Sequence, residues 1–158
     1  MVDNPKTLLL TGASRGIGHA TVKRFSAAGW RVLTVSRHAF SEHCPWEGGE
    51  ANHVQLDLAD IAALPAAIEA LRRKLPTGRL DALVNNAGIS PKGTDGRRLG
   101  TLNTEQATWQ AVFNVNFFAP ILLARGLVDE LRAAQGSIVN VTSIAGSRVH
   151  PFAGAAYA

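Results

Sequence analysis

Residues 11–18 read Thr-Gly-Ala-Ser-Arg-Gly-Ile-Gly, a glycine-rich segment whose backbone could bind an anion. They follow the apolar run 7–10, so the pattern predicts a strand that ends in a tight turn and opens a helix. The first turn of a helix has N–H groups without intrahelical partners, and the helix dipole adds partial positive charge there. Such an end can bind a diphosphate where no side chain blocks the approach. The residues expected at this site are Gly12, Ser14, Arg15, Gly16, Ile17 and Gly18. A tight turn that binds nothing remains the alternative.

The end of the second predicted strand indicates which dinucleotide would bind. Many dinucleotide folds have an acid there that holds the ribose 2′-hydroxyl. This chain instead reads Val-Ser-Arg-His over 35–38, without a carboxylate. The guanidinium groups of Arg37 and Arg15 can together chelate a 2′-phosphate, which a carboxylate would repel. The sequence therefore predicts NADP(H) rather than NAD(H), with a solvated surface cation as the alternative interpretation of Arg37.

Three motifs together resemble the short-chain dehydrogenase/reductase family. They are the glycine turn, the Asn-Asn-Ala-Gly of residues 85–88, and Ser143 followed by Tyr157, and they follow one another in the family's order along the whole chain. The resemblance implies that Asp57 hydrogen-bonds the adenine amino group and that Leu58 contributes backbone. It also implies that the segment Asn85-Asn86-Ala87-Gly88 packs beside the cofactor ribose and steadies the sheet centre, with Asn85, Ala87 and Gly88 as the expected cofactor-binding residues. From the residues alone, Asp57 could equally cap the following helix, and an Asn pair is common turn chemistry.

The same resemblance implies a catalytic group of Asn116, Ser143 and Tyr157. Ser143 would hydrogen-bond the substrate oxygen, and Tyr157 would act as general acid/base. Taken alone, Ser143 is a loop hydroxyl, Asn116 a helical amide satisfied locally, and Tyr157 a terminal tyrosine. A phenol is a poor base at neutral pH without a nearby cation, and the family's lysine would fall three residues beyond Ala158. We therefore expect an N-terminal part of a longer enzyme, with little turnover of its own.

A proline gives one independent hint about Asn116. Pro120 has no N–H to donate to the Asn116 carbonyl four residues earlier. A carbonyl left free in this way could hold a water, which would suit a proton relay towards the tyrosine.

Strand-like and helix-like segments alternate along the chain. The predicted strands are 6–11, 31–35, 53–56, 80–84 and 137–141, and the predicted helices are 16–28, 61–75 and 104–134. This alternation predicts an α/β fold, a Rossmann-type doubly wound parallel sheet with strand order 3-2-1-4-5. Residues 1–158 would form one NADP-binding domain, incomplete at its C-terminus. The ligand crevice is expected between strands one and four, at their carboxyl ends.

Composition limits the other classes of function. The 158 residues are 46% hydrophobic and 18% charged, which excludes a disordered chain. The net charge of +4 comes without a basic, aromatic face, so no nucleic-acid partner is expected. No apolar run approaches the roughly 20 residues that a membrane span needs, and the five histidines have no metal-ligand spacing. The single Cys44 is interpreted as a surface thiol in a reducing cytoplasm.

The partners expected for this chain follow from the resemblance. They are a small-molecule carbonyl or alcohol substrate, and further copies of the longer parent in a homodimer or homotetramer. Two alternatives stay open: a module that senses NADP(H) without catalysis, and a structural partner that uses the long helix for oligomer contacts.

Overall fold

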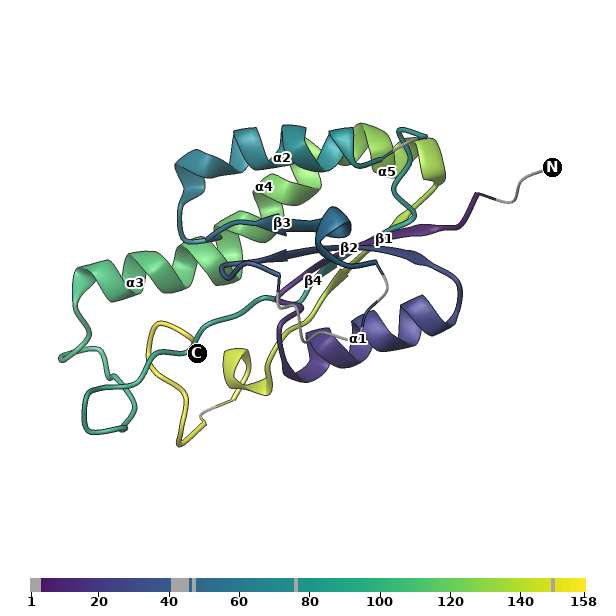
Figure 1. The fold of residues 1–158 in the computed structure, drawn as a ribbon. Helices are drawn as coiled ribbons and strands as arrows, with labels where there is room; N and C mark the ends of the chain where they lie inside the picture. The colour runs from purple at the N-terminus through teal and green to yellow at the C-terminus, as the bar shows by residue number, and fades with distance from the viewer. Residues whose placement is uncertain (1–3, 41–45, 47, 76, 149) are drawn as a thin grey trace.

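A computed structural model describes residues 4–40, 46, 48–75, 77–148 and 150–158 (Figure 1). Its strands form one parallel sheet in the order β3-β2-β1-β4-β5, which confirms the predicted fold class and strand order. The strands are β1 (Thr7–Thr11), β2 (Arg31–Ser36), β3 (His53–Gln55), β4 (Ala82–Asn85) and β5 (Ser137–Asn140). Cys44, interpreted above as a surface thiol, lies outside the described residues.

Helices cover both faces of this sheet. In Figure 1, α1 lies below the strands, whereas α2, α4 and α5 lie above them. The α-helices are α1 (Gly16–Ala27), α2 (Leu64–Arg73), α3 (Gln106–Phe113), α4 (Ala119–Gly126) and α5 (Val128–Ala134). Short 3₁₀ turns occur at η1 (Glu50–Asn52), η2 (Ile61–Ala63) and η4 (Ile144–Gly146), and η3 (Asn114–Phe118) is a π-helical segment.

The apolar run of β1 explains why the sheet has two cores. Leu9 packs into the cluster formed with α2 and α4, and Leu8 and Leu10 pack with Val22 of α1 on the opposite face. All three leucines are at most 1% exposed. A central parallel strand is buried on both faces, so it is continuously apolar rather than alternating.

The helix predicted over 104–134 is not one regular helix, so this part of the prediction is wrong. The Ala119 N–H donates to the Asn114 carbonyl, five residues earlier, in the π segment. Pro120 follows at once, and a proline that removes an N–H commonly accompanies such a local change in helical winding. Leu127 then separates α4 from α5. The water expected at the Asn116 carbonyl stays a prediction.

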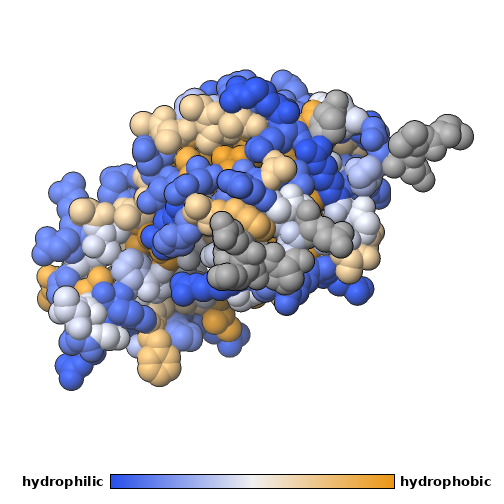
Figure 2. Space-filling model, in the orientation of Figure 1, coloured by the Kyte–Doolittle hydropathy of each residue, from blue (hydrophilic) through white to orange (hydrophobic). Residues whose placement is uncertain are grey.

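Residues Gln106–Gly126 correct the expectation about membrane spans. This 21-residue helical stretch, with a mean hydropathy of 1.2, is long and apolar enough by length and composition to cross a bilayer. Core helices of soluble proteins pass the same criterion, but they are mostly buried, whereas 22% of the 18-residue window is buried here, including Val112, Val115, Ala119 and Leu123. On the face drawn in Figure 2, hydrophilic residues predominate and apolar residues are exposed in separate groups.

Candidate functional site

The carboxyl ends of β1, β2, β3 and β4 open into a cleft of about 570 Å³. Most of the predicted cofactor-binding residues line it: Gly12, Ser14, Arg15, Gly16, Ile17, Arg37, Asp57, Leu58, Ala87 and Gly88. The cleft therefore brings together segments that are far apart in the chain. The Ala87 N–H, for example, donates to Thr11 Oγ1, which is 76 residues away in the sequence. Asn86, part of the segment expected beside the ribose, also lines the cleft, as do Ser36 and His38, for which no role was predicted.

Two glycines of the turn are required by its shape, and a third by close packing. Gly12 and Gly16 have φ values of +71° and +59°, which disfavour residues with a Cβ. Gly18 does not line the cleft. A Cβ on Gly18 would lie 2.1 Å from the Gly12 carbonyl oxygen. Gly18 thus allows α1 to approach the turn closely and sets the direction in which the helix N-terminus points.

The N-terminus of α1 carries no side-chain cap. Arg15 occupies the N-cap position without a side-chain hydrogen bond, and the first turn contains no acidic residue. The segment that leads into α2 is different, because Asp60 accepts hydrogen bonds there from the Ala62 and Ala63 N–H groups. The first amides of α1 are therefore available to an anion in the cleft.

Asn86 and Thr11 fasten the end of β4 to the glycine turn. Asn86 Nδ2 donates to the carbonyl oxygens of Thr11 and Gly12, at 3.0 and 3.1 Å. In return, Thr11 Oγ1 accepts from the N–H groups of Asn86 and Ala87, at 3.1 and 3.0 Å. Thr11 is only 2% exposed, so these hydrogen bonds hold the floor of the cleft from inside the sheet.

The Asn85 side chain points away from the glycine turn, towards β5. Its Nδ2 donates to Asn140 Oδ1 at 2.8 Å, across the β4–β5 pair. Asn85 lines a second pocket of about 340 Å³, together with Asn116 and Asn140, and the structure does not bring it to the glycine cleft. Its buried Oδ1 has no hydrogen-bond partner among the described residues.

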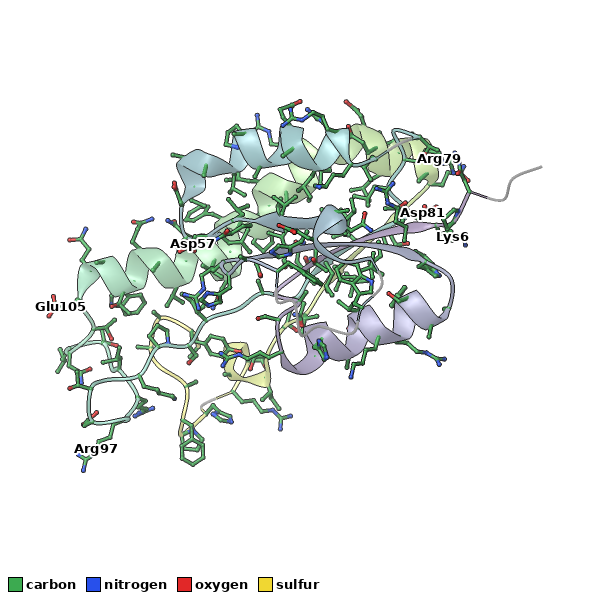
Figure 3. The ribbon with its side chains drawn as sticks, in the orientation of Figure 1. Lys6, Asp57, Arg79, Asp81, Arg97 and Glu105 are labelled. Atoms are coloured by element: carbon green, nitrogen blue, oxygen red, sulfur yellow. The ribbon has the colours of Figure 1, made fainter. Side chains whose placement is uncertain are left out.

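Two arginines line the cleft, Arg37 after the end of β2 and Arg15 at the N-cap of α1. No carboxylate in the described part of the chain lies within salt-bridge distance of Arg15 or Arg37. Asp57 lies at the carboxyl end of β3 (Figure 3), where its Oδ1 accepts from the Ala59 N–H at 2.9 Å. Asp57 therefore forms a local turn, whereas Asp60 provides the cap considered in the sequence analysis.

The three predicted catalytic residues lie in separate local settings. Asn116 clamps the Ile89 backbone, accepting from its N–H and donating to its carbonyl, both at 2.9 Å. Ser143 is exposed, and its Oγ accepts from the Ala145 N–H at 3.2 Å, where η4 begins. Tyr157 lines a small pocket beside α3. Among the residues that the structure describes, no hydrogen bond joins these three side chains.

Charged groups away from the cleft have structural partners. The Arg72 guanidinium at the end of α2 hydrogen-bonds Glu69, Glu130 and the Gly126 carbonyl. The hydrogen bond to Glu69, followed by the charge of Glu130, raises the pKa of Arg72. Asp81, labelled in Figure 3 at the opposite end of the sheet from Asp57, accepts from the Thr7 N–H at 2.8 Å. These contacts support interpreting Arg72 as a structural cation rather than part of a nucleic-acid surface.

Comparison with known proteins identifies the family. Residues 6–158 match the family model of the short chain dehydrogenase. The chain belongs to the short-chain dehydrogenase/reductase family. Protein FixR of Bradyrhizobium diazoefficiens is 62% identical over 155 residues, which cover 98% of this chain and 56% of that protein. The chain thus spans little more than half the length of that curated relative.

Two solved structures of the family match this fold with different cofactors. An oxidoreductase of the family from Brucella ovis, in complex with a partially ordered NAD, has 64% identity and a TM-score of 0.94. That match covers 98% of this chain and 70% of the other. A metagenomic short-chain oxidoreductase in complex with NADP has 34% identity and a TM-score of 0.79, covering 96% and 67% of the two chains.

Proposed function

We propose that this chain is the nucleotide-binding part of an NADP(H)-dependent oxidoreductase that acts on a carbonyl or alcohol substrate. The observation that carries the proposal is the cleft at the carboxyl ends of the strands. There the uncapped N-terminus of α1 faces a β2 end that bears Arg37 and, among its described neighbours, no paired acid. A nicotinamide bound in this cleft would supply or accept the hydride.

The cleft residues divide between the two ends of such a dinucleotide. The amides of Gly16 and Ile17 would bind the diphosphate, and Arg15 and Arg37 would bind a 2′-phosphate. Asp57 would accept a hydrogen bond from the adenine. The two solved relatives hold NAD in one case and NADP in the other, so the preference for NADP(H) is argued from this chain's own guanidinium groups.

Proton transfer would fall to Tyr157, with the Ser143 hydroxyl donating a hydrogen bond to the substrate oxygen. Asn116 would keep the segment after β4 in position through Ile89. These side chains are separate in the described structure, so we propose that the 158 residues alone have little or no turnover.

Two measurements test this proposal. Isothermal titration calorimetry with NADPH and NADH tests the cleft in the chain as it stands. Hydride transfer to a panel of carbonyl compounds tests the chemistry in any longer protein that the gene encodes around these residues. In such a protein, Tyr157→Phe should abolish turnover and leave NADPH affinity unchanged. Measurable reduction by the 158-residue chain, or full activity of the Tyr157→Phe protein, would contradict the assignment.

A second candidate is an NADP(H)-binding module without catalysis. The structure favours it in one respect, because the nucleotide cleft is assembled whereas the catalytic hydroxyls are not joined to each other. A longer protein that binds NADPH but transfers no hydride to any compound of the panel would support this alternative.

We further propose that the parent forms homo-oligomers through the helical surface of η3 and α4. Phe117, Phe118 and Ile121 are each more than 40% exposed there, which is typical of an interaction surface.

A further inference from the structure

A row of polar side chains on one face of β2 and β3 holds the loop that carries Arg37. The parallel register pairs Thr34 with His53 and Ser36 with Gln55. Side chains two residues apart on a strand point to the same face, so these four lie side by side next to the end of β2. A half-buried sheet face would ordinarily be apolar, so a polar row calls for partners.

The partners are backbone carbonyl groups of the Arg37 loop. Gln55 Nε2 donates to the Arg37 carbonyl at 3.0 Å, and His53 Nε2 lies 2.9 Å from the His38 carbonyl. Ser36 Oγ also donates to the His38 carbonyl, at 3.0 Å. Two successive peptide groups of the loop are therefore hydrogen-bonded to the sheet.

The ring of His53 is itself fixed on its other side. A carbonyl oxygen can only accept, so Nε2 of His53 must carry a proton. Its Nδ1 lies 2.9 Å from Thr34 Oγ1, and Thr34 is 2% exposed within β2. The loop is thus tied through His53 to a buried residue of the central sheet, rather than to a freely moving surface group.

We infer that Gln55 and His53 are positioning residues for nucleotide selectivity, because they fix the backbone from which Arg37 reaches a 2′-phosphate. This inference rests on the proposed function. Fixing the backbone leaves the guanidinium itself free to bind the ligand. It also lowers the backbone entropy that the loop loses when it is ordered around a bound ligand. NADH has no 2′-phosphate, so its affinity should depend little on this anchor.

The test is a double-mutant cycle on the dissociation constants of NADPH and NADH, measured by calorimetry. Gln55→Met keeps the length of the side chain and removes the donor. We expect it to weaken NADPH binding about three- to tenfold and to leave NADH binding unchanged. In an Arg37→Ala background the same substitution should have no further effect, because the group it positions is gone.

Asn52→Ala serves as the matched control. Asn52 precedes β3 and binds Arg31 and the Gly48 carbonyl, away from the Arg37 loop. It should lower stability without changing the ratio of the two affinities. His53→Phe tests the second hydrogen bond to the loop, the one between His53 and the His38 carbonyl. If the His53→Phe protein does not fold, the Gln55→Met variant still tests the inference, because Gln55 is exposed.

These affinities distinguish a failure of the proposed NADPH preference from a failure of the positioning role of Gln55 and His53. If the unsubstituted protein does not prefer NADPH, the proposed cofactor preference fails and the inference fails with it. If it does prefer NADPH, two results would overturn the inference alone. One is that Gln55→Met leaves the ratio of NADPH to NADH affinity unchanged. The other is that Gln55→Met weakens NADPH binding as much in the Arg37→Ala background as in the unsubstituted protein.

Discussion

Helix propensity and packing predict opposite effects of Gly18→Ala on the stability of the protein. Gly18 lies inside α1, where helix propensity alone predicts that alanine stabilises the protein by about 1 kcal/mol. The packing predicts the reverse, because the new Cβ would lie 2.1 Å from the Gly12 carbonyl oxygen and 2.9 Å from the Gly12 carbonyl carbon. The contact is with backbone, so rotating a side chain cannot relieve it. Overpacking of this kind costs about 1–3 kcal/mol, so after the gain in helix propensity we expect a net loss of up to about 2 kcal/mol in the free energy of unfolding.

The same substitution should damage the nucleotide cleft. Its Cβ would also lie 2.6 Å from Asn86 Nδ2, which ties β4 to the turn. Relief of both contacts requires α1 to move away from the turn, which moves its first amides. Losing one hydrogen bond to a charged phosphate would weaken NADPH binding about tenfold.

Urea unfolding and NADPH calorimetry of the Gly18→Ala protein provide the assay, with Gly29→Ala as the control. Gly29 has φ +77°, and a Cβ there would meet no described atom within 4 Å. Alanine at Gly29 should cost about 1 kcal/mol through backbone strain, without changing NADPH affinity. A Gly18→Ala protein that is more stable than the parent and binds NADPH equally well would refute the close approach of α1.

Other substitutions test the cofactor preference and the hydrogen bonds around the cleft. Arg37→Asp should reverse the preference for NADPH over NADH by replacing attraction with repulsion, a change of about 100-fold in the affinity ratio; unchanged NADPH affinity by calorimetry would count against Arg37. Thr11→Val leaves the Asn86 and Ala87 N–H groups without their acceptor and should lower stability to urea by about 2 kcal/mol, most of which Thr11→Ser should restore. Asn116→Leu should lower stability by about 1–3 kcal/mol and speed hydrogen exchange at the Ile89 amide, and unchanged exchange there would argue against the clamp.

The fold could be predicted because its main signals are local. The apolar run of β1 and the glycine turn behind it identify a buried parallel strand that leads into a helix. Alternation with helices then leaves few possible topologies. The π segment at η3 was missed because it depends on how the helix repacks around Pro120, which residue spacing does not reveal.

The directions of the two asparagine side chains at the end of β4 could not be predicted from the sequence. Neighbouring residues of a strand point to opposite faces, so one amide must face the glycine turn and the other must face away. The motif alone does not say which. The structure has Asn86 at the turn and Asn85 against Asn140, whereas the sequence predicted both in the segment beside the cofactor. Gln55 and His53 were missed because their role depends on the β2–β3 register.

We propose that the first amides of α1, with two guanidinium groups, bind a phosphorylated dinucleotide. The amide chemical shifts of the protein, followed during an NADPH titration, would show whether these groups contact the ligand. We predict that Gly16, Ile17 and Gly18 shift most and that they saturate at a lower concentration of NADPH than of NADH. Absence of binding, or the largest shifts around the Asn85–Asn140 pocket, would show that the α1 N-terminus is not the nucleotide site.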